Sequence, residues 1–329
     1  MTRAIVARAP TRLDFGGGWT DVPPYTEREG GAVCSLAITR YATATAALDE
    51  RAARRAGAGA LSDDPLTAAA LRRAGIPGAV AHVTIDFPAG AGLGGSSACG
   101  VALAGALAML RGVALAPNEL AALSRETEVE DLGVAGGYQD HYAATYGGAL
   151  LLGFAECASV EALALPGTSA VDLVRRSVLL YTGESRLSAT TVAAVRDAYL
   201  AGEPRTVAAL ARIKTLAGEM AAALRAGDID ALGGLVGEHW VHQRALHPTI
   251  TTPKIDAIAE RAGRAGALGM KALGASGGGC VLAIAREGRE EELSAAIAPL
   301  GQALDFAIDW DGFQVVAVLD EHHSDGLVP

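Results

Sequence analysis

Cysteine is scarce in this chain. Only four occur among 329 residues, and Cys34, Cys99, Cys157 and Cys280 are scattered without the CxxC spacing of zinc and redox sites. This pattern excludes a disulfide scaffold and a cysteine-rich metal module. Two of the four lie in apolar patterns, so we expect reduced, packed thiols and a cytoplasmic location.

Basic charge is scarce as well. The 27 Lys and Arg residues face 37 Asp and Glu residues, which gives a net charge of −10. No block of Lys or Arg is long enough for a nucleic-acid surface, so we expect no nucleic-acid partner. In such an acidic protein, the positive charge that a polyanionic ligand needs must be local, at a bound cation, a single basic side chain or a helix N-terminus.

Long hydrophobic runs are also missing. The longest strongly apolar stretch, Ala98 to Leu110, is too short to span a bilayer. Arg3, Arg8 and Arg12 interrupt the first residues, which predicts that no signal peptide begins the chain. A chain of this length with 50% hydrophobic residues can nevertheless bury one large or two ordinary cores. We therefore expect a globular protein without a membrane partner.

Glycine, in contrast, is abundant, with 41 residues. The most informative cluster, PAGAGLGGSSA, runs from Pro88 to Ala98, between the alternating apolar run Val80–Phe87 and the Ala/Leu-rich run that ends at Leu110. This order predicts a strand, a glycine loop and a helix. Backbone N–H groups without Cβ atoms beside them can close on a ligand, and the helix N-terminus adds partial positive charge. The loop therefore predicts a phosphate site.

Three known motifs are candidates for this loop. Gly90-x-Gly92-x-x-Gly95 satisfies the dinucleotide fingerprint, but the acidic residue needed about twenty positions later is missing, because the region around Pro117 reads as a helix start. A Walker A loop needs a Gly-Lys pair, and none occurs in the chain. With one extra glycine, the segment resembles the phosphate loop of the GHMP kinases, the superfamily of galactokinase, homoserine kinase, mevalonate kinase and phosphomevalonate kinase.

This resemblance implies ATP as the cofactor. Ser96 and Ser97 stand where the helix begins, where a hydroxyl can touch a phosphate oxygen or its magnesium ion. The implied ATP-binding residues are Pro88, Gly90, Gly92, Leu93, Gly94, Gly95, Ser96, Ser97 and Ala98.

The segment from Arg8 to Asp21, RAPTRLDFGGGWTD, extends the resemblance. In the family's substrate segment an Arg is followed nine residues later by the Asp of a Thr-Asp pair, and Arg12 and Asp21 match that spacing. Gly-Trp stands where galactokinases carry Glu-His, so the sugar contacts must differ from those to galactose. A carboxylate can accept two hydroxyl hydrogen bonds and an aromatic face suits the apolar side of a sugar ring. We expect Trp19, Thr20 and Asp21 to hold the substrate.

A third segment, Gly269 to Val281, resembles the family's last glycine-rich motif, with Leu273 and Ser276 as departures. So much glycine lets the backbone approach a bound group closely, and the resemblance implies that Gly277 and Gly278 lie against the substrate. Three such matches occur in the family's order, and the distance from the first to the last spans most of the chain.

Between these motifs, Glu128, Gly137 and Asp140 match the spacing of the sugar-kinase branch. The implied roles are Mg²⁺ ligand for Glu128, together with Ser97, and catalytic base for Asp140. Mg²⁺ prefers a few carboxylate or hydroxyl oxygens plus water and substrate phosphate, which suits this set. Arg12 is expected near Asp140, where it keeps the carboxylate ionised.

Not every acidic residue of this segment can share that site. Glu126 and Glu128 are separated by roughly 200° around a helix axis. We expect Glu126 and Glu130 to lie on a solvated helix face.

The overall pattern predicts an α+β protein without regular βαβ repetition, which argues against a doubly wound sheet. It agrees with the two-domain GHMP kinase fold, which has its active site in the cleft between domains 1–180 and 181–329. Expected helices include 98–110, 118–131, 189–200, 207–226, 229–245, 253–265 and 290–298; expected strands include 4–8, 33–38, 41–48, 80–87, 149–154, 178–181, 304–310 and 314–319.

Histidines raise the question of a zinc site. His239 and His242 share one helix face, but no carboxylate or cysteine completes a recognisable ligand set. We interpret them as polar side chains of a helix surface beside the cleft.

The sequence thus predicts an ATP- and Mg²⁺-dependent kinase that phosphorylates the anomeric hydroxyl of a sugar or sugar phosphate. Within the superfamily, the WTDVPP and GGYQD segments most resemble the D-glycero-D-manno-heptose 7-phosphate kinase and L-fucose kinase groups. A heptose phosphate would need a distal cation, with Arg244, Lys254 and Lys271 as candidates. The alternatives are a free-sugar kinase of the L-fucose type, a non-catalytic nucleotide-binding module and an NAD-linked oxidoreductase. The sequence leaves the oligomeric state open.

Overall fold

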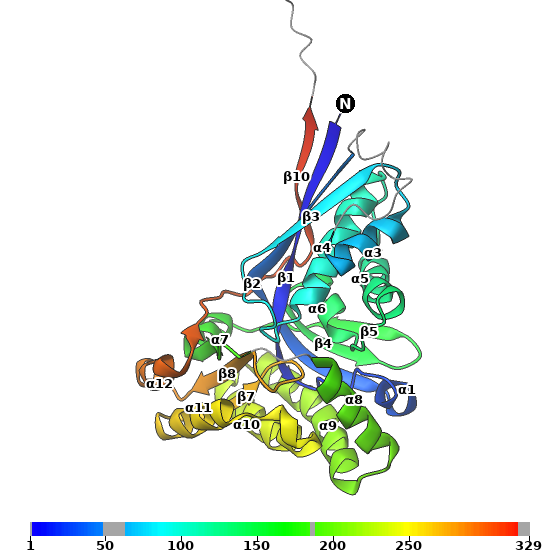
Figure 1. Cartoon of the computed structure of the whole chain (residues 1–329). Helices are drawn as coiled ribbons and strands as arrows, with labels where there is room; N and C mark the ends of the chain where they lie inside the picture. Colours follow the sequence, from blue (N-terminus) through cyan, green and yellow to red (C-terminus); the bar gives the residue numbers. More distant parts are fainter. Residues whose placement is uncertain (1, 49–62, 185–187, 322–329) are drawn as a thin grey trace, which may run out of the picture.

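The computed structural model describes residues 2–48, 63–184 and 188–321, and it builds them around two antiparallel sheets (Figure 1). The larger sheet has the strand order β10–β1–β2–β4–β5, with β3 paired to β2. Its strands are β1 (Thr2–Gly16), β2 (Gly31–Leu48), β3 (Ala79–Ile85), β4 (Ala149–Phe154), β5 (Ala158–Ala162) and β10 (Gln314–Glu321). The smaller sheet, in the order β7–β8–β6–β9, comprises β6 (Ser177–Tyr181), β7 (Ala267–Ala272), β8 (Cys280–Ala285) and β9 (Gln302–Ala303).

Helices cover both sheets. The first half of the chain contains α1 (Tyr25–Glu29), α3 (Pro65–Ala74), α4 (Gly95–Leu110), α5 (Pro117–Glu126), its π-helical extension η2 (Thr127–Asp131) and α6 (Gln139–Tyr146). The second half contains α7 (Ser169–Arg176), α8 (Ser188–Leu200), α9 (Pro204–Ala226), α10 (Ile229–Leu246), α11 (Pro253–Arg264), α12 (Glu290–Ile297) and the 3₁₀ turns η3 (Pro248–Ile250) and η4 (Ala298–Leu300).

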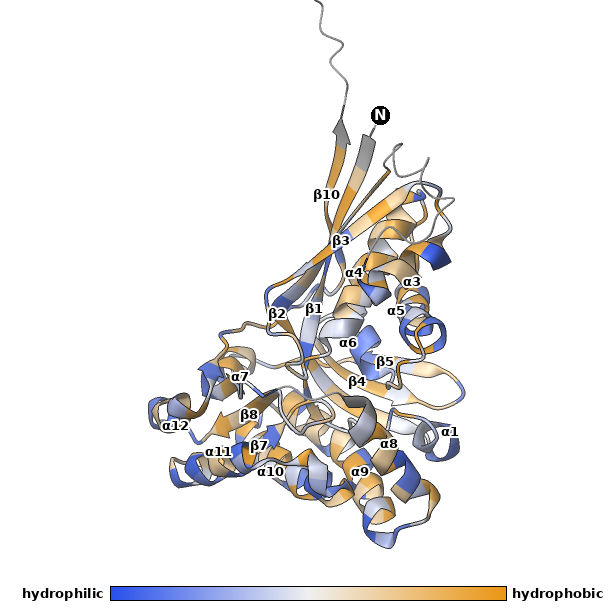
Figure 2. Ribbon diagram, in the orientation of Figure 1, coloured by the Kyte–Doolittle hydropathy of each residue, from blue (hydrophilic) through white to orange (hydrophobic). Residues whose placement is uncertain are grey.

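The helix α4 is the centre of the first half. It is apolar all round, as expected of a buried helix, and packs on β1 and β2. Figure 2 shows hydrophobic colouring along β8 and β10 and hydrophilic patches on the outer helices α11 and α12. None of the helices in the described ranges is long and apolar enough to cross a membrane.

The larger sheet joins distant parts of the chain. β10 pairs antiparallel with β1, so residues 314–321 complete the sheet that residues 2–16 begin. β6 spans the expected boundary between residues 180 and 181 and belongs to the smaller sheet. The division into domains 1–180 and 181–329 remains a prediction.

Comparison with the sequence patterns confirms the α+β class and corrects several elements. The two strands expected over 33–38 and 41–48 form one continuous strand, β2. The helix expected over 118–131 ends at Glu126 and continues as the π-helical turn η2. The strand expected over 304–310 is irregular apart from one bridge, Ile308 to Ile38. The strand expected over 149–154 is found with the same bounds, as β4.

Candidate active site

The glycine loop has the geometry of an anion cradle. Gly90, Gly92 and Gly94 have φ values of 69°, 73° and 73°, so left-handed residues alternate with ordinary ones. Such alternation turns successive N–H groups toward one side, and α4 begins directly afterwards at Gly95. The described loop can therefore bind a phosphate group with its backbone.

Segments from the other motifs hold this loop from two sides. The amide of Cys280, at the start of β8, donates to Ala91 O at 2.7 Å, and the amide of Arg12 donates to Leu93 O at 3.0 Å. The glycine loop, β1 and the third motif therefore meet at one place, although they are far apart in the sequence.

Arg12 and Asp140 form an ion pair at the edge of the loop. Arg12 Nε donates to Asp140 Oδ1 at 2.7 Å, and its Nη1 donates to Gly92 O at 2.7 Å. The side chain of Arg12 is 3% exposed and that of Asp140 is 24% exposed, so the carboxylate is the accessible partner. Burial opposes the charge of Arg12, but Asp140 and two other carboxylates outweigh it and raise the pKa of the guanidinium.

Beside this pair lies a serine–glutamate cluster, formed by Ser97, Glu128, His141 and Ser124. Ser97 Oγ donates to Glu128 Oε2 at 3.0 Å. Glu128 lies in the π-helical turn η2, and such turns are frequent at functional sites. Burial raises the pKa of Glu128. Within the described residues no Lys or Arg pairs with this carboxylate.

This donor set fits Mg²⁺. A buried carboxylate and a neighbouring hydroxyl supply hard oxygens, and the missing cationic partner of Glu128 is the charge that a divalent ion would bring. No group of three or more His, Cys, Asp or Glu that could hold a metal occurs in the described part of the chain. The remaining ligands would have to be water and phosphate oxygens, as is usual for Mg²⁺.

His141 is a member of the cluster that the sequence analysis missed. It follows Asp140 on α6 and is buried, and burial together with Arg125 lowers its pKa to about 3. Its position directly after Asp140, the expected base, could have indicated from the sequence that His141 lies near the active site. Glu126, in contrast, lies on another face as expected, because it forms an ion pair with Arg73 at 2.5 Å.

Asp21 lies in a different setting from the one expected. Its Oδ2 accepts hydrogen bonds from the amides of Tyr138 and Gln139, at 2.8 and 3.0 Å, at the start of α6. The close approach requires glycine at 137, because a Cβ there would lie 2.0 Å from Asp21 Oδ2. Burial, opposed by the backbone donors and aided by Asp140, raises the pKa of Asp21 to about 6. In this structure Asp21 anchors the helix that carries Asp140, and sugar binding by Asp21 remains a prediction.

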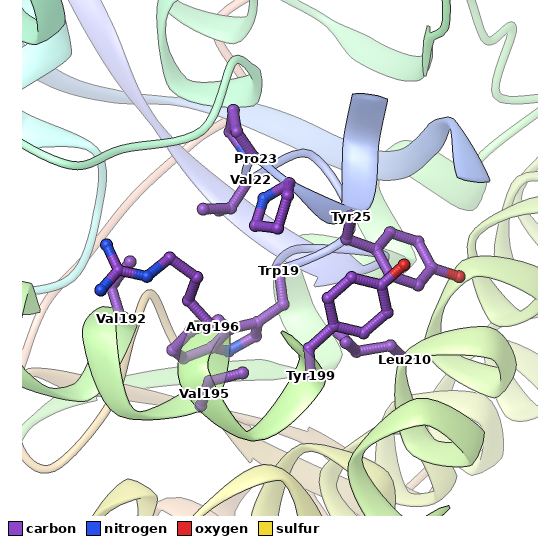
Figure 3. Close-up of a pocket in the computed structure, with 10 residues that line it drawn as sticks. Trp19, Val22, Pro23, Tyr25, Val192, Val195, Arg196, Tyr199 and Leu210 are labelled. Carbon is purple, nitrogen blue, oxygen red and sulfur yellow. The ribbon is translucent and has the colours of Figure 1, made fainter. Parts of the chain in front are cut away.

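Thr20 and Trp19 are also packed rather than open. The Thr20 hydroxyl donates to Gly17 O at 2.7 Å and lies 3.1 Å from Ala32 O. Trp19 is 7% exposed. Figure 3 shows it beside Val195 and Arg196 of α8 and near the rings of Tyr25 and Tyr199, whose centroids are 5.3 Å apart. The free space there is about 20 Å³, room for about one water molecule, so the Trp19 face is not open to a sugar in this conformation.

Lys271 does not belong to a phosphate pocket, which corrects one expectation. It is fully buried and donates to Asp14 Oδ2 at 2.8 Å and Asp14 O at 2.7 Å. Together with His239 these residues form an aspartate–lysine cluster. Burial lowers the pKa of Lys271, and despite its own burial Asp14 has a lowered pKa because Lys271 lies beside it.

His239 corrects a second expectation, because it is buried and not on the helix surface. Its Nε2 accepts the amide of Gly17 at 3.2 Å. Burial, with Lys271 nearby, lowers its pKa well below the ordinary value, so His239 is a neutral acceptor that holds the substrate segment.

The remaining candidates each have a partner within the protein. Arg244 lies 3.3 Å from Asp256 and is half exposed, while Lys254 donates to Thr182 O. The amide of Gly277 donates to Ile250 O at 2.8 Å, so the third motif is held against η3. Substrate contact by Gly277 and Gly278 remains a prediction.

Comparisons with known proteins agree with this arrangement. The model of the GHMP kinases N terminal domain matches residues 64–148, and that of the GHMP kinases C terminal matches residues 220–300. Together they cover about half of the chain.

Two curated proteins are among the similar sequences. A D-glycero-alpha-D-manno-heptose 7-phosphate kinase of Campylobacter jejuni is 33% identical over 200 residues, which are 60% of this chain and 58% of that protein. An L-fucokinase/L-fucose-1-P guanylyltransferase of Bacteroides fragilis is 28% identical over 86% of this chain and 35% of that protein. The chain thus spans well under two thirds of the length of these relatives.

Among solved structures, a D-glycero-D-manno-heptose 1-phosphate kinase from Bacteroides thetaiotaomicron superposes with a TM-score of 0.76 at 25% identity. The superposition covers 98% of this chain and 100% of the other. The two-sheet arrangement described above is therefore shared over the whole chain.

Proposed function

The chain belongs to the GHMP kinase family, and on this premise we propose that it transfers the γ-phosphoryl group of ATP to the anomeric hydroxyl of a sugar, with D-glycero-D-manno-heptose 7-phosphate as the expected substrate. The observation that carries the proposal is the Arg12–Asp140 ion pair, 2.7 Å long, at the edge of a glycine loop built to bind phosphate.

Asp140 is the proposed base. Its side chain is the accessible member of the pair and lies against the loop, since a Cβ at Gly94 would be 3.0 Å from its Cγ. A carboxylate at this position can accept the proton of a sugar hydroxyl while the loop holds the phosphates. Arg12 fixes the orientation of Asp140 and supplies positive charge where negative charge develops.

Ser97 and Glu128 are the proposed Mg²⁺ ligands. When bound, the ion neutralises charge on the phosphate oxygens. The buried Glu128 carboxylate and the Ser97 hydroxyl supply two of its oxygen ligands.

For the substrate, two relatives support different sugars. The heptose 7-phosphate kinase supports a phosphorylated heptose, and the fucokinase supports a free sugar as the second candidate. With Lys271 buried, Arg244 and Lys254 remain the proposed cations for a distal phosphate. The four cysteines are free, and a reducing cytoplasm remains the expected location.

The two other functional classes have less support. An NAD-linked oxidoreductase would require a doubly wound parallel sheet, whereas the sheets here are antiparallel. A module without catalysis would have no need of the accessible carboxylate of Asp140 beside the loop.

The decisive experiment compares Asp140→Asn with the wild type. The amide cannot accept the proton, so we expect turnover to fall by about 10²–10⁴-fold while ATP still binds, as judged by a Tm increase with ATP. Heptose 7-phosphate, L-fucose and D-galactose serve as acceptors, and NAD serves as the control ligand for Tm. Wild-type turnover in Asp140→Asn contradicts the proposed base, and a preference for unphosphorylated L-fucose contradicts the heptose phosphate.

A further inference from the structure

His141 is buried within the active site, yet the proposed chemistry gives it no role. Its Nε2 lies 3.3 Å from both Ser97 Oγ and Glu128 Oε2, and its Nδ1 lies 2.9 Å from Ser124 Oγ. One imidazole ring on α6 therefore bridges α4, α5 and the turn η2.

The hydrogen-bond partners define the state of the ring. The Ser97 hydroxyl has one hydrogen and donates it to Glu128, so Ser97 Oγ accepts from His141 Nε2, and that nitrogen must carry a hydrogen. His141 thus donates from Nε2, and Nδ1 accepts from the Ser124 hydroxyl. Ser97 in turn donates to Glu128 at 3.0 Å. The hydrogen bonds thus run from Ser124 through His141 and Ser97 to Glu128, and the last two residues are the expected metal ligands.

We propose that His141, held by Ser124, is a positioning residue that fixes Ser97 and Glu128 in the orientation needed to bind Mg²⁺. This inference rests on the proposed function. Glu128 lies in a π-helical turn, where its place is not set by an ordinary helix register, and no Lys or Arg among the described residues holds its carboxylate. A histidine donor that orients a ligating hydroxyl and, through it, a ligating carboxylate is an outer-shell contact of the kind that tunes metal sites.

The test measures metal binding directly, with Mn²⁺ as the probe. The full chain with a non-hydrolysable ATP analogue is titrated with Mn²⁺, and free Mn²⁺ is followed by electron paramagnetic resonance. We expect His141→Leu to weaken Mn²⁺ binding about 10–100-fold. His141→Gln places an N–H group near the original Nε2 and should restore affinity to within about threefold of the wild type, because the donor is what matters.

Two further variants separate positioning from packing. Ala144→Gly removes a buried methyl group from the same helix, outside the polar cluster, and should lower Tm while Mn²⁺ affinity stays unchanged. Ser124→Ala removes the donor to Nδ1 and should weaken Mn²⁺ binding less than His141→Leu does. If His141→Leu does not fold, the Mn²⁺ affinities of Ser124→Ala and His141→Gln are compared with that of the wild type instead.

The outcomes are distinct. A folded His141→Leu variant with wild-type Mn²⁺ affinity overturns the inference, as does a His141→Gln variant as weak as His141→Leu. Wild-type affinity in Ser124→Ala also overturns it. A wild-type chain that binds no Mn²⁺, or a Glu128→Gln variant that binds it normally, overturns the proposed metal site itself and this inference with it.

Discussion

The aspartate–lysine cluster and the serine–glutamate cluster are both buried, and both contain a carboxylate and a histidine, yet their electrostatics are opposite. Lys271 beside Asp14 keeps the pKa of that carboxyl low, whereas burial without a cation raises the pKa of Glu128. In the first cluster, the charge of Asp14 is balanced by Lys271 within the protein. The second needs a positive charge from outside, which distinguishes a structural carboxylate from one prepared for a ligand.

Asp21 is a third buried carboxylate. It is buried like Asp14 and has no Lys or Arg hydrogen-bonded to it among the described residues, but backbone amides of α6 satisfy its Oδ2. Burial raises its pKa to about 6, although these backbone donors oppose the rise. Lys271 lowers the pKa of Asp14, whereas Asp21 and Glu128, which have no such cation among the described residues, have raised pKa values.

The largest effect is expected when the complete cluster is broken. Lys271→Met leaves Asp14 buried without its cation and should lower the free energy of unfolding by about 3–5 kcal/mol. Urea titration measures this free energy of unfolding. The double variant Lys271→Met/Asp14→Asn should recover part of the loss, since no charge is stranded; if it is as unstable as the single variant, the ion pair is not the cause.

Asp21 should give a pH-dependent effect of about 2–3 kcal/mol, since one pKa unit is worth about 1.4 kcal/mol. Its folded pKa of about 6 lies above the unfolded value, so the native state binds more protons between pH 4 and 6 and loses stability as the pH rises through that window. Asp21→Asn should remove this slope. Parallel stability curves for variant and wild type between pH 4 and 7 would contradict the raised pKa.

Glu128→Gln should act in the opposite direction from Lys271→Met. Removing an uncompensated buried charge should stabilise the metal-free protein by about 1 kcal/mol at pH 7, at the expense of function. The sign follows from the raised pKa, because the native state is penalised once Glu128 ionises. Calorimetry of the metal-free chain measures the change in stability. A lower Tm in the variant would refute the view that Glu128, unlike Asp14, is a destabilising buried charge.

The smallest effect is expected at Glu126. Its ion pair with Arg73 is partly exposed, so Glu126→Gln should cost no more than about 1 kcal/mol and leave the Mg²⁺ dependence of activity unchanged. Arg73 keeps Asp131 as a partner at 2.7 Å. A change in Mg²⁺ dependence equal to that of Glu128→Gln would show that the two faces of this segment are not separate.

The sequence predicted those parts of the site whose residues have a characteristic spacing within a short motif. Glycine spacing predicted the loop before α4, and the spacing of Glu128 and Asp140 predicted two carboxylates that the structure places beside that loop. Family resemblance supplied their roles, which remain proposals.

The rest depends on pairing between distant segments, which no local pattern encodes. Asp14 and Lys271 are 257 residues apart, so neither position alone reveals a buried ion pair. Asp21 and the amide of Gln139 are 118 residues apart, so the sequence did not reveal this contact either. The π-helical turn η2 also escaped prediction, because helical periodicity does not distinguish one extra residue in a turn.

The pairing of β10 with β1 has a consequence for how the protein is made. Roughly 300 residues separate the two strands, which at ribosomal rates of about 5–20 residues per second is roughly 15–60 s of synthesis. During that time the outer edge of the strand that carries Arg12 has no partner from this sheet. An unpaired edge can recruit other chains, so the nascent protein is most prone to aggregate just before its last strand emerges. A polypeptide that stops short of Gln314 never closes that edge.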